Sequence, residues 1–350
     1  MHTKERKTEI KTYNLCILGF GNVGRALARH LLAKREDLRN EYGIEWRVTG
    51  VATRRMGWIA DPQGIDLEAL LAGNVPPTQT EPRDVQEWLQ AAQADVLFEL
   101  TSTNPQTGQP AIDYMRTALE LGAHVVTANK GPVVHAYVEL EELAQRKGKR
   151  FLFEATVMAG APIFSLYQNS LPATKLMRFR GLLNATSNVI INEMEQGKNF
   201  AEAVKRAQEL GIAETDPSLD VDGWDATVKL CAIANVLMDV PLKLEEVQRE
   251  GIRELQPAEL QRARAAGTPY KQVATLERVG QDVVARVQTE QVEAGDPLAA
   301  VSPASMLAHM EMDIVPGGLT VTLHLPEDET AGPDATAYDV MADFIRAVSA

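Results

Sequence analysis

The 350-residue chain is poor in cysteine, in aromatic residues and in long apolar runs. Its two cysteines, Cys16 and Cys231, show neither C-x-x-C nor zinc-ligand spacing, so a disulfide framework and a zinc site are disfavoured and both thiols are expected in an apolar core. No apolar run reaches about 18 residues, and the N-terminus lacks the apolar stretch of a signal peptide. These absences disfavour a membrane span and export, and they predict a cytoplasmic protein.

Basic charge is also scarce, with 35 Lys and Arg against 48 Asp and Glu, a net charge of −13. Without a long basic run, nucleic acid and anionic membranes are disfavoured as partners, and a small-molecule substrate is favoured. The hydrophobic fraction of 45% is enough for ordinary cores, and the length suits two domains.

The order of sequence patterns predicts an α/β fold. Between residues 12 and 153, short apolar runs such as NLCILGF, WRVTGVAT, ADVLFEL and HVVTA alternate with amphipathic helical stretches, which is typical of a Rossmann-type parallel sheet covered by helices. Over 154–304, apolar helices near 187–196, 200–210 and 223–238 precede alternating segments such as KQVATLERV, which predicts a second, α+β domain. The segment from about 305 to 350, which ends in a helix, is expected to return and complete the first domain.

A glycine-rich turn joins the first predicted strand to the first helix in ILGFGNVGRALARHLL. Gly19 would allow a tight turn, Gly21 a close approach of the backbone to a pyrophosphate, and Gly24 close packing of the helix. The phosphate would lie on the helix N-terminus. Because the strand and helix flank the turn as the motif requires, dinucleotide binding is favoured over a purely structural turn.

Arginines follow the second predicted strand, where an acidic residue would bind the ribose hydroxyls of NAD. Thr53 is followed there by Arg54 and Arg55, and an arginine can pair with a 2′-phosphate. This favours NADP, with NAD possible. The alternative is that both arginines are solvated loop residues.

Two later strands end in polar loops, with Thr101 and Ser102 in FELTSTNP and Lys130 in HVVTANKG. Ligands of open parallel sheets bind beyond the carboxyl ends of the strands, so Lys130 is expected near the nicotinamide or the substrate. A loop lysine in water is the alternative interpretation.

The apolar helix predicted over 223–238 contains one isolated lysine, Lys229. Asp225 lies four residues earlier and therefore on the same face. Burial lowers the pKa of an ammonium group and nearby carboxylates raise it, so such a lysine can be poised to exchange a proton. Upstream acids, including Glu214 and Asp220, would then need a cation of their own, such as a substrate ammonium. A buried structural ion pair remains the alternative.

At these residues the chain resembles the homoserine dehydrogenase family over nearly its whole length. The resemblance rests on GFGNVG, HVVTANKGP, FEATVMAGAPIF, GLLNATSNVI and AQELGIAETDPSLDVDGWDATVK, in that order. It implies interconversion of L-homoserine and L-aspartate 4-semialdehyde with NAD(P), a step toward threonine, methionine and isoleucine. It further implies that Lys229 is the acid/base and that Glu214, Asp220 and Asp225 hold the substrate.

The resemblance also implies further ligand contacts and an assembly. It adds a monovalent cation such as Na⁺, bound by Glu154 and the carbonyl groups of Val157, Ala159 and Ala161, and a homodimer formed through the second domain. The further implied cofactor contacts are Phe20, Asn22, Val23, Thr101, Lys130, Gly211 and Gly332.

The chain departs from the family pattern in two places. Only Gly332 remains of a glycine-rich segment before the last helix, and Ala185 replaces a glycine, although it takes positive φ less readily. Because the chain ends at Ala350, a regulatory C-terminal ACT domain is not expected.

Other functions stay open as alternatives. Aspartate-semialdehyde dehydrogenase chemistry needs a reactive cysteine, for which Cys16 and Cys231 are poorly placed. A hydroxy-acid reductase would usually show a catalytic histidine, but the six histidines form no recognisable set. A noncatalytic nucleotide-binding relative would be expected to lack Lys229 or Glu214.

Overall fold

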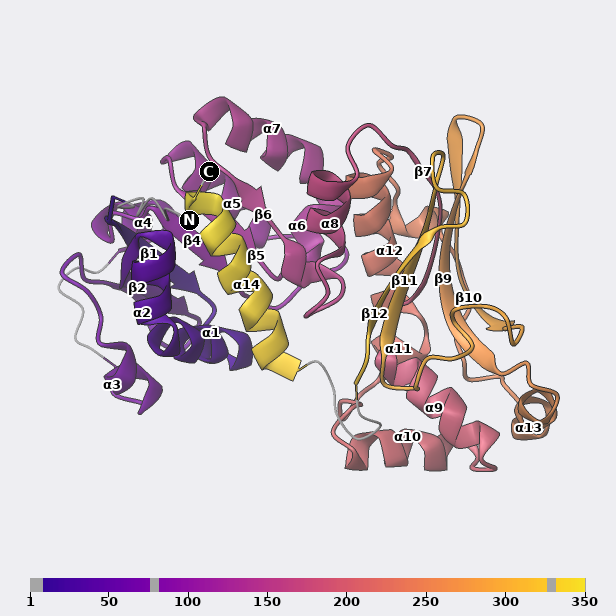
Figure 1. Ribbon diagram of the computed structural model, residues 1–350. Helices are drawn as coiled ribbons and strands as arrows, with labels where there is room; N and C mark the ends of the chain where they lie inside the picture. Colours follow the sequence, from indigo (N-terminus) through magenta and orange to yellow (C-terminus); the bar gives the residue numbers. More distant parts are fainter. Residues whose placement is uncertain (1–8, 76–81, 326–331, 350) are drawn as a thin grey trace, which may run out of the picture. The chain divides into compact units, whose positions relative to one another are not determined.

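The computed structural model describes residues 9–75, 82–325 and 332–349, and the chain divides into two compact units (Figure 1). Unit 1 comprises residues 1–156 and 333–350, and unit 2 comprises residues 157–332. No helix within the described ranges has both the length and the apolar character needed to cross a bilayer.

Unit 1 is built on a six-stranded sheet in the order β3-β2-β1-β4-β5-β6. All neighbouring strands are parallel except β3, which pairs antiparallel with β2. The predicted α/β class is therefore confirmed, with an antiparallel edge strand that the sequence did not predict. The strands are β1 (Lys11–Leu18), β2 (Ile44–Thr53), β3 (Gly57–Ala60), β4 (Val96–Glu99), β5 (His124–Thr127) and β6 (Phe151–Leu152).

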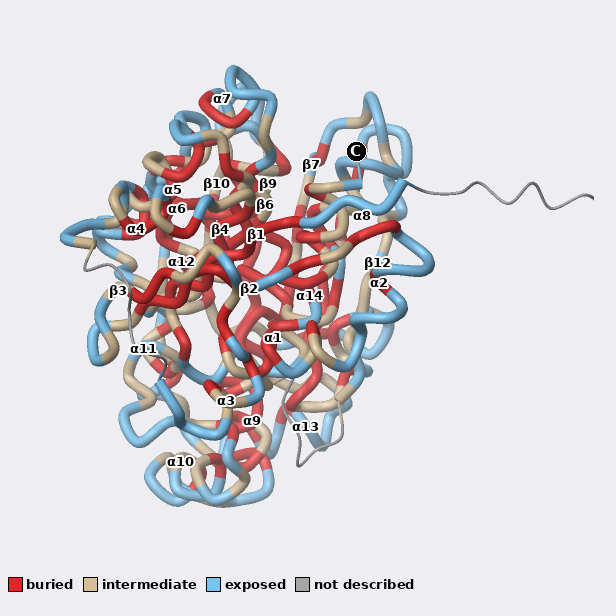
Figure 2. Tube along the Cα trace, turned by 90° about the vertical axis from the view of Figure 1, so that its left-hand side faces the viewer, coloured by how far each residue is buried: buried red, intermediate tan, exposed pale blue. Residues whose placement is uncertain are grey.

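Helices cover this sheet because its central strands are apolar on both faces. Every residue of β4 is buried, as are the last six of β1 (Figure 2). Such strands need a helix layer on each side. The helices are α1 (Asn22–Ala33), α2 (Arg35–Tyr42), α3 (Leu67–Leu71), α4 (Val85–Ala91), α5 (Ala111–Glu120), α6 (Lys130–His135), α7 (Tyr137–Lys147) and the short 3₁₀ turn η1 (Glu154–Thr156).

The C-terminal helix α14 (Gly332–Val348) also packs on this unit. Its Phe344 is fully buried, with ring centroids 5.7 Å from Phe98 and 6.2 Å from Tyr13. Burying a phenylalanine side chain stabilises a fold by about 1.5–3 kcal/mol. The helix is thereby held against the sheet, alongside α1 in Figure 1.

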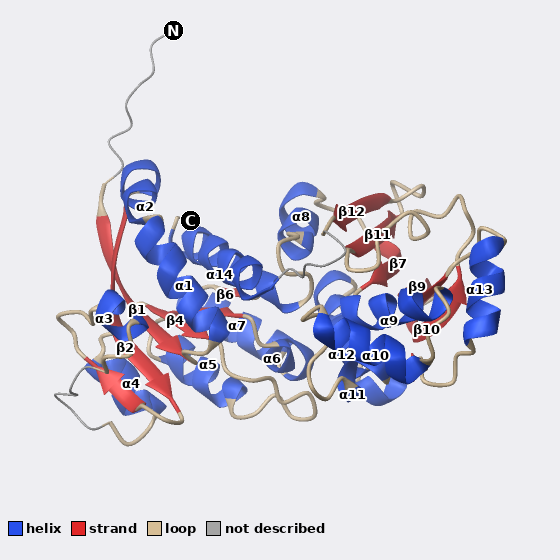
Figure 3. Cartoon of the chain, turned by 90° about the horizontal axis from the view of Figure 1, so that it is seen from below, coloured by secondary structure: helices blue, strands red, loops and turns tan. Residues whose placement is uncertain are grey.

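Unit 2 contains a second six-stranded sheet in the order β12-β11-β7-β9-β10-β8. Helices α9 and α12 pack against one of its faces (Figure 3). Its strands are β7 (Leu176–Leu182), β8 (Gln248–Arg249), β9 (Tyr270–Val279), β10 (Asp282–Gln291), β11 (Met306–Met312) and β12 (Leu319–Leu323). Its helices are α8 (Ile163–Ser170), α9 (Ala185–Glu195), α10 (Phe200–Glu209), α11 (Ser218–Val221), α12 (Trp224–Leu237), the 3₁₀ turn η2 (Leu244–Glu246) and α13 (Pro257–Ala265).

The expectation that the segment from about 305 onward completes the first domain is wrong for its first part. Strand β11 pairs with β7, and β12 pairs with β11, so both belong to the sheet of unit 2. The backbone N–H and C=O groups of β7 need partners on this side, and β11 supplies them. Only α14 returns to unit 1.

Candidate functional site

The glycine turn in unit 1 links β1 to α1. Gly19 has φ of +100°, and a Cβ atom there would lie 2.5 Å from the Leu100 carbonyl oxygen. A Cβ atom on Gly24 would lie 2.3 Å from the Gly19 carbonyl oxygen, so both positions require glycine. At Gly21, by contrast, no heavy atom of the described chain comes within 4 Å of the point where a Cβ atom would lie, which leaves open space in front of the backbone.

The N-terminus of α1 is suited to an anion. Gly21 is its N-cap residue, and no side chain caps it. The backbone N–H groups of Asn22, Val23 and Gly24 are therefore free of intrahelical acceptors and carry the positive end of the helix dipole. Phe20, just before them, is buried. Open space at Gly21 together with uncapped amides fits a dinucleotide pyrophosphate.

A cavity of about 400 Å³ lies at the carboxyl end of β2 in unit 1. Its polar side includes Thr53, the last residue of β2, Arg54 in the turn that follows, and Thr101 and Ser102 after β4. Arg54 and Arg55 are both exposed, but within the described chain Arg55 lies outside the cavity lining. The place expected for a ribose phosphate therefore has Arg54 beside it.

Glu99 is a buried carboxyl group at this edge of the sheet that sequence reasoning missed. Its Oε1 accepts hydrogen bonds from the backbone N–H of Thr101, at 3.0 Å, and from the Thr101 hydroxyl. Its Oε2 lies 3.1 Å from the Thr127 hydroxyl, whose single hydrogen can be donated to the Glu99 carbonyl oxygen 2.9 Å away. Burial raises the pKa of Glu99 more than the hydrogen bonds from Thr101, Thr127 and Asn129 lower it, and a protonated Oε2 would satisfy this geometry by donating to Thr127.

Replacing Glu99 with glutamine is expected to flatten the pH dependence of stability. A carboxyl group whose pKa is raised on folding binds more protons in the folded state, so the free energy of unfolding falls as the pH rises above its unfolded value of 4.5. Glutamine keeps the acceptor for Thr101 and the donor for Thr127 but does not ionise. The melting temperature of Glu99→Gln relative to that of the wild type should therefore increase as the pH is raised toward neutral.

The matched control for this variant is Glu120→Gln, because Glu120 is exposed at the end of α5. Parallel pH profiles of Glu99→Gln and the wild type would contradict a protonated, buried Glu99.

Lys130 is the first residue of α6, three residues after the end of β5. The preceding Asn129 is the N-cap residue, and its side chain accepts a hydrogen bond of 3.1 Å from the Gly131 N–H. This cap defines the start of α6 and so places the backbone of Lys130 just beyond the carboxyl end of β5.

In unit 2, Lys229 lies on α12, a helix with ten of its fourteen residues buried. Its side chain is 13% exposed, and its Nζ lies 2.8 Å from Asp225 Oδ2. Nζ also donates a 2.7 Å hydrogen bond to the Leu183 carbonyl oxygen. An ammonium group has three N–H donors, so within the described chain one remains for a ligand.

Asn184 connects this pair to a second acid. Its Nδ2 atom donates to Asp220 Oδ1 at 2.6 Å and to Asp225 Oδ2 at 3.1 Å. Its Oδ1 accepts from the Ser187 N–H at 2.8 Å and so caps α9. Burial, and then the negative charge of Asp225, raise the pKa of Asp220, while the hydrogen bond from Asn184 opposes them. Ala185 begins α9 outside the positive-φ region, so its replacement of glycine causes no strain.

Two other predicted residues lie apart from this cluster. Glu214 is exposed in the loop after α10, and within the described chain no hydrogen bond or ion pair joins its carboxylate to Asp220, Asp225 or Lys229. Gly211, which starts this loop, has φ of +73°. The structure therefore assembles Lys229 with Asp220 and Asp225, and leaves Glu214 on an accessible loop.

The residues predicted to bind a cation lie on both sides of the boundary between the units. Glu154 belongs to unit 1, where its carboxylate lies 3.2 Å from the Arg346 guanidinium of α14. Val157, Ala159 and Ala161 begin unit 2, and the Ala161 carbonyl accepts a 2.9 Å hydrogen bond from Ile163. Among the described residues, no cluster of three His, Cys, Asp or Glu side chains could hold a metal ion. The cation site stays a prediction from the resemblance.

Gly332, the remaining glycine near the last helix, is the first residue of α14 and has φ of +42°. The segment just before it lies outside the described residues.

Neither thiol is available as a nucleophile. Cys16 and Cys231 are fully buried and unpaired, and burial raises the pKa of both, that of Cys231 to about 12. Chemistry that depends on a reactive cysteine is thus disfavoured.

The parallel sheet, the glycine turn and the uncapped helix N-terminus define a dinucleotide-binding protein of the Rossmann class. Comparison with known proteins narrows this class. The model of the homoserine dehydrogenase family matches residues 162–345, and that of the homoserine dehydrogenase NAD-binding domain matches residues 19–154. The chain belongs to the homoserine dehydrogenase family, whose members are NAD(P)-dependent oxidoreductases.

Individual relatives agree over almost the whole chain. An NAD(+)-dependent homoserine dehydrogenase of Pseudomonas canavaninivorans is 33% identical over 95% of this chain and 96% of its own. A crystal structure of a putative homoserine dehydrogenase from Archaeoglobus fulgidus has a TM-score of 0.83 at 31% identity, covering 95% of this chain and 98% of its own. A hyperthermophilic archaeal homoserine dehydrogenase in complex with NADPH has a TM-score of 0.80 at 28% identity, covering 96% of this chain and 98% of its own.

Proposed function

We propose that this chain interconverts L-homoserine and L-aspartate 4-semialdehyde with NADP, as a step toward threonine, methionine and isoleucine, and that Lys229 is its acid/base. The observation that carries the mechanism is the ammonium of Lys229, held by Asp225 and the Leu183 carbonyl oxygen with one N–H donor remaining. We also propose a cytoplasmic location, which the two unpaired thiols support and which cell fractionation would test.

The dinucleotide, when bound, supplies the hydride for the aldehyde carbon. Lys229 then donates the proton of its remaining N–H to the alkoxide oxygen that forms, and in the oxidative direction it takes this proton back. Asp225 and the Leu183 carbonyl oxygen fix Nζ during both transfers. Without this proton the alkoxide would be left charged in a partly buried site, which is costly.

The acidic residues around Lys229 suit the ammonium group of an amino-acid substrate. Asp220 and Asp225 share the Asn184 amide group, so two carboxylates face the charge of a single lysine. A second cation would balance this excess negative charge. Glu214, on its exposed loop, is assigned to the same substrate by the family resemblance.

NADP is favoured over NAD because Arg54 lines the cavity at the end of β2. Named relatives include both an NAD(+)-dependent enzyme and a complex with NADPH, so the family resemblance alone does not give the preference, and the proposal rests on Arg54. The purified protein is expected to reduce NADP⁺ in the presence of L-homoserine, and to do so at lower cofactor concentration than NAD⁺. A protein that binds NADPH but leaves L-homoserine unoxidised would contradict the proposal.

A monovalent cation at Glu154 and the carbonyl groups of Val157, Ala159 and Ala161 is a further part of the proposal. Hard oxygen ligands suit such an ion. The ion would share the Glu154 carboxylate with Arg346, and no proton transfer passes through it. The same assay with sodium exchanged for tetramethylammonium at constant ionic strength is expected to show a lower rate, and an unchanged rate would count against the ion.

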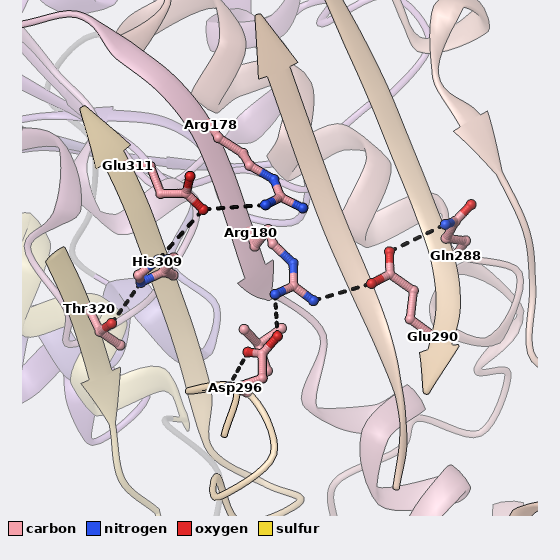
Figure 4. Close-up of polar contacts among 9 residues, drawn as sticks. Arg178, Arg180, Gln288, Glu290, Asp296, His309, Glu311 and Thr320 are labelled. Carbon is pink, nitrogen blue, oxygen red and sulfur yellow. Dashed lines mark hydrogen bonds and ion pairs between the residues drawn. The ribbon is translucent and has the colours of Figure 1, made fainter. Parts of the chain in front are cut away.

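Homodimerisation is proposed through the face of the unit 2 sheet that carries Arg178, Arg180, Glu290 and Glu311 (Figure 4). Arg178 lies 3.4 Å from Glu311, and Arg180 lies 3.2 Å from Glu290. Both signs of charge therefore lie on one patch, which can be complementary to a second copy of itself across a two-fold axis. The buried hydroxyl of Thr275 and the Nε atoms of both arginines have no partner within the described chain.

A large charged side chain in this face should separate the protomers. Thr275→Arg is expected to shift the mass measured by light scattering from twice 38.3 kDa toward 38.3 kDa. Gln261→Arg on the exposed side of α13 is the control and should leave the mass unchanged. A wild-type protein that is monomeric at micromolar concentration would refute the proposed dimer.

A further inference from the structure

The cavity at the end of β2 is lined by aromatic side chains as well as by Arg54. Trp58 of β3 and Tyr114 of α5 both line it, together with Pro110. Arg54, Thr53 and Ser102 supply the polar part of the lining. A flat apolar surface beside a cation and hydroxyl groups matches the two ends of a phosphorylated adenosine, the base and the ribose phosphate.

Trp58 is held in place by the rings around it. Its ring centroid lies 5.3 Å from that of Trp88 and 6.0 Å from that of Tyr114, the latter in an edge-to-face arrangement at 85°. Trp88 is fully buried, and its Nε1 donates a 2.8 Å hydrogen bond to the Ile59 carbonyl oxygen. A ring fixed in this way loses little conformational freedom when a ligand binds.

The hairpin between β2 and β3 places this ring next to the arginine. Trp58 pairs with Ala52, and Gly57 pairs with Thr53. The short turn that contains Arg54 therefore connects Thr53 to the strand that carries Trp58. One short hairpin therefore presents both an indole and a guanidinium to the same cavity.

We propose that Trp58 positions the adenine ring of the dinucleotide by packing its indole against the base. This inference deepens the proposed function by assigning the aromatic side of the cavity to the base, while Arg54 binds the phosphate. It concerns binding alone and does not depend on which substrate is oxidised.

The probes that test this assignment lack nicotinamide. Adenosine 2′,5′-bisphosphate carries the base and the 2′-phosphate, and AMP carries the base without the 2′-phosphate. Calorimetric titration of the full chain is expected to show that Trp58→Leu weakens both probes about tenfold or more, the usual contribution of a base stacked on an aromatic ring. Trp58→Phe, which keeps an aromatic face, should recover most of this affinity.

Tryptophan fluorescence gives a second readout. Stacking of adenine on Trp58 is expected to quench part of the wild-type emission, and Trp58→Phe should abolish this quenching. Trp224→Phe is the matched control, because Trp224 is partly exposed on α12 in unit 2, and it should retain the quenching. Melting curves of each variant establish that it is folded, and the phenylalanine variant carries the test where the leucine variant is unstable.

Three results would each overturn the proposal. They are wild-type affinity of Trp58→Leu for both probes, quenching that persists in Trp58→Phe, and a wild-type protein that binds neither probe. Its failure is distinguishable from failure of the proposed function. If the protein oxidises homoserine but its affinity for the adenosine probes does not depend on Trp58, only the adenine assignment is wrong. Trp58-dependent probe binding without homoserine oxidation would remove only the proposed reaction.

Discussion

Replacing Lys229 with alanine is expected to lower kcat by about 10²- to 10⁴-fold, the usual contribution of a positioned general acid, without changing the Kd for NADPH. The glycine turn and the cavity beside Arg54 lie in unit 1, whereas Lys229 lies in unit 2, so the variant leaves the proposed cofactor contacts intact. The loss should appear in kcat because the proton is needed only as the alkoxide forms.

Two controls separate proton transfer from charge and from folding. Lys229→Arg keeps a positive charge beside Asp225 but does not release a proton near neutral pH, so it should also lose most of kcat. Lys205→Ala removes an exposed lysine of α10 and should have wild-type activity. Because Asp225 loses its ion pair with Lys229 in Lys229→Ala, the melting temperature of that variant must be measured alongside.

The second large effect is expected at Arg54. Arg54→Ala should raise the Kd for NADPH by about 10- to 100-fold, since a hydrogen bond to a charged group contributes about 1.5–3 kcal/mol. The Kd for NADH should stay unchanged, because NADH has no 2′-phosphate. The preference for NADPH would therefore shrink by the same factor.

Arg55→Ala provides a close comparison, since Arg55 is the next residue of the same exposed turn but lies outside the cavity lining of the described chain. Fluorescence titration of both variants with both cofactors should show the larger change at Arg54. An unchanged cofactor preference in both variants would contradict the assignment of a ribose phosphate to this cavity.

Local sequence patterns predicted much of this structure. The glycine turn was predictable because Gly19 and Gly24 occupy positions where a Cβ atom would collide with backbone, and this steric rule acts over a few residues. Lys229 was conspicuous because one charge interrupts an otherwise apolar helix. The burial of both cysteines followed from their apolar neighbours in β1 and α12.

Features that depend on distant partners were not predictable in the same way. Asn184 lies 36 residues before Asp220 and 41 before Asp225, so nothing local marks its amide as the link between them. Glu99 looks like any strand-end acid until the hydroxyl groups around it are known. The sequence of β11 is typical of a strand but does not identify the strand with which it pairs, so its place in the sheet of unit 2 is not predictable from the sequence.

The edge strand β3 shows a further limit. Its four residues are too few to produce a clear alternation, so the sequence predicts a strand end at the arginines and not a hairpin. Trp58, the residue that the hairpin brings to the cavity, was missed for the same reason.

A single-turnover measurement tests the role of Lys229 most directly. L-Aspartate 4-semialdehyde is mixed with enzyme saturated with NADPH, and the oxidation of the bound cofactor is followed in wild type and in Lys229→Ala. Product release does not contribute to this rate. The rate constant for oxidation of the bound NADPH is expected to be about 10²-fold or more lower in Lys229→Ala than in the wild type. Cofactor oxidation at the same rate in both proteins would contradict the assignment of Lys229 as the acid.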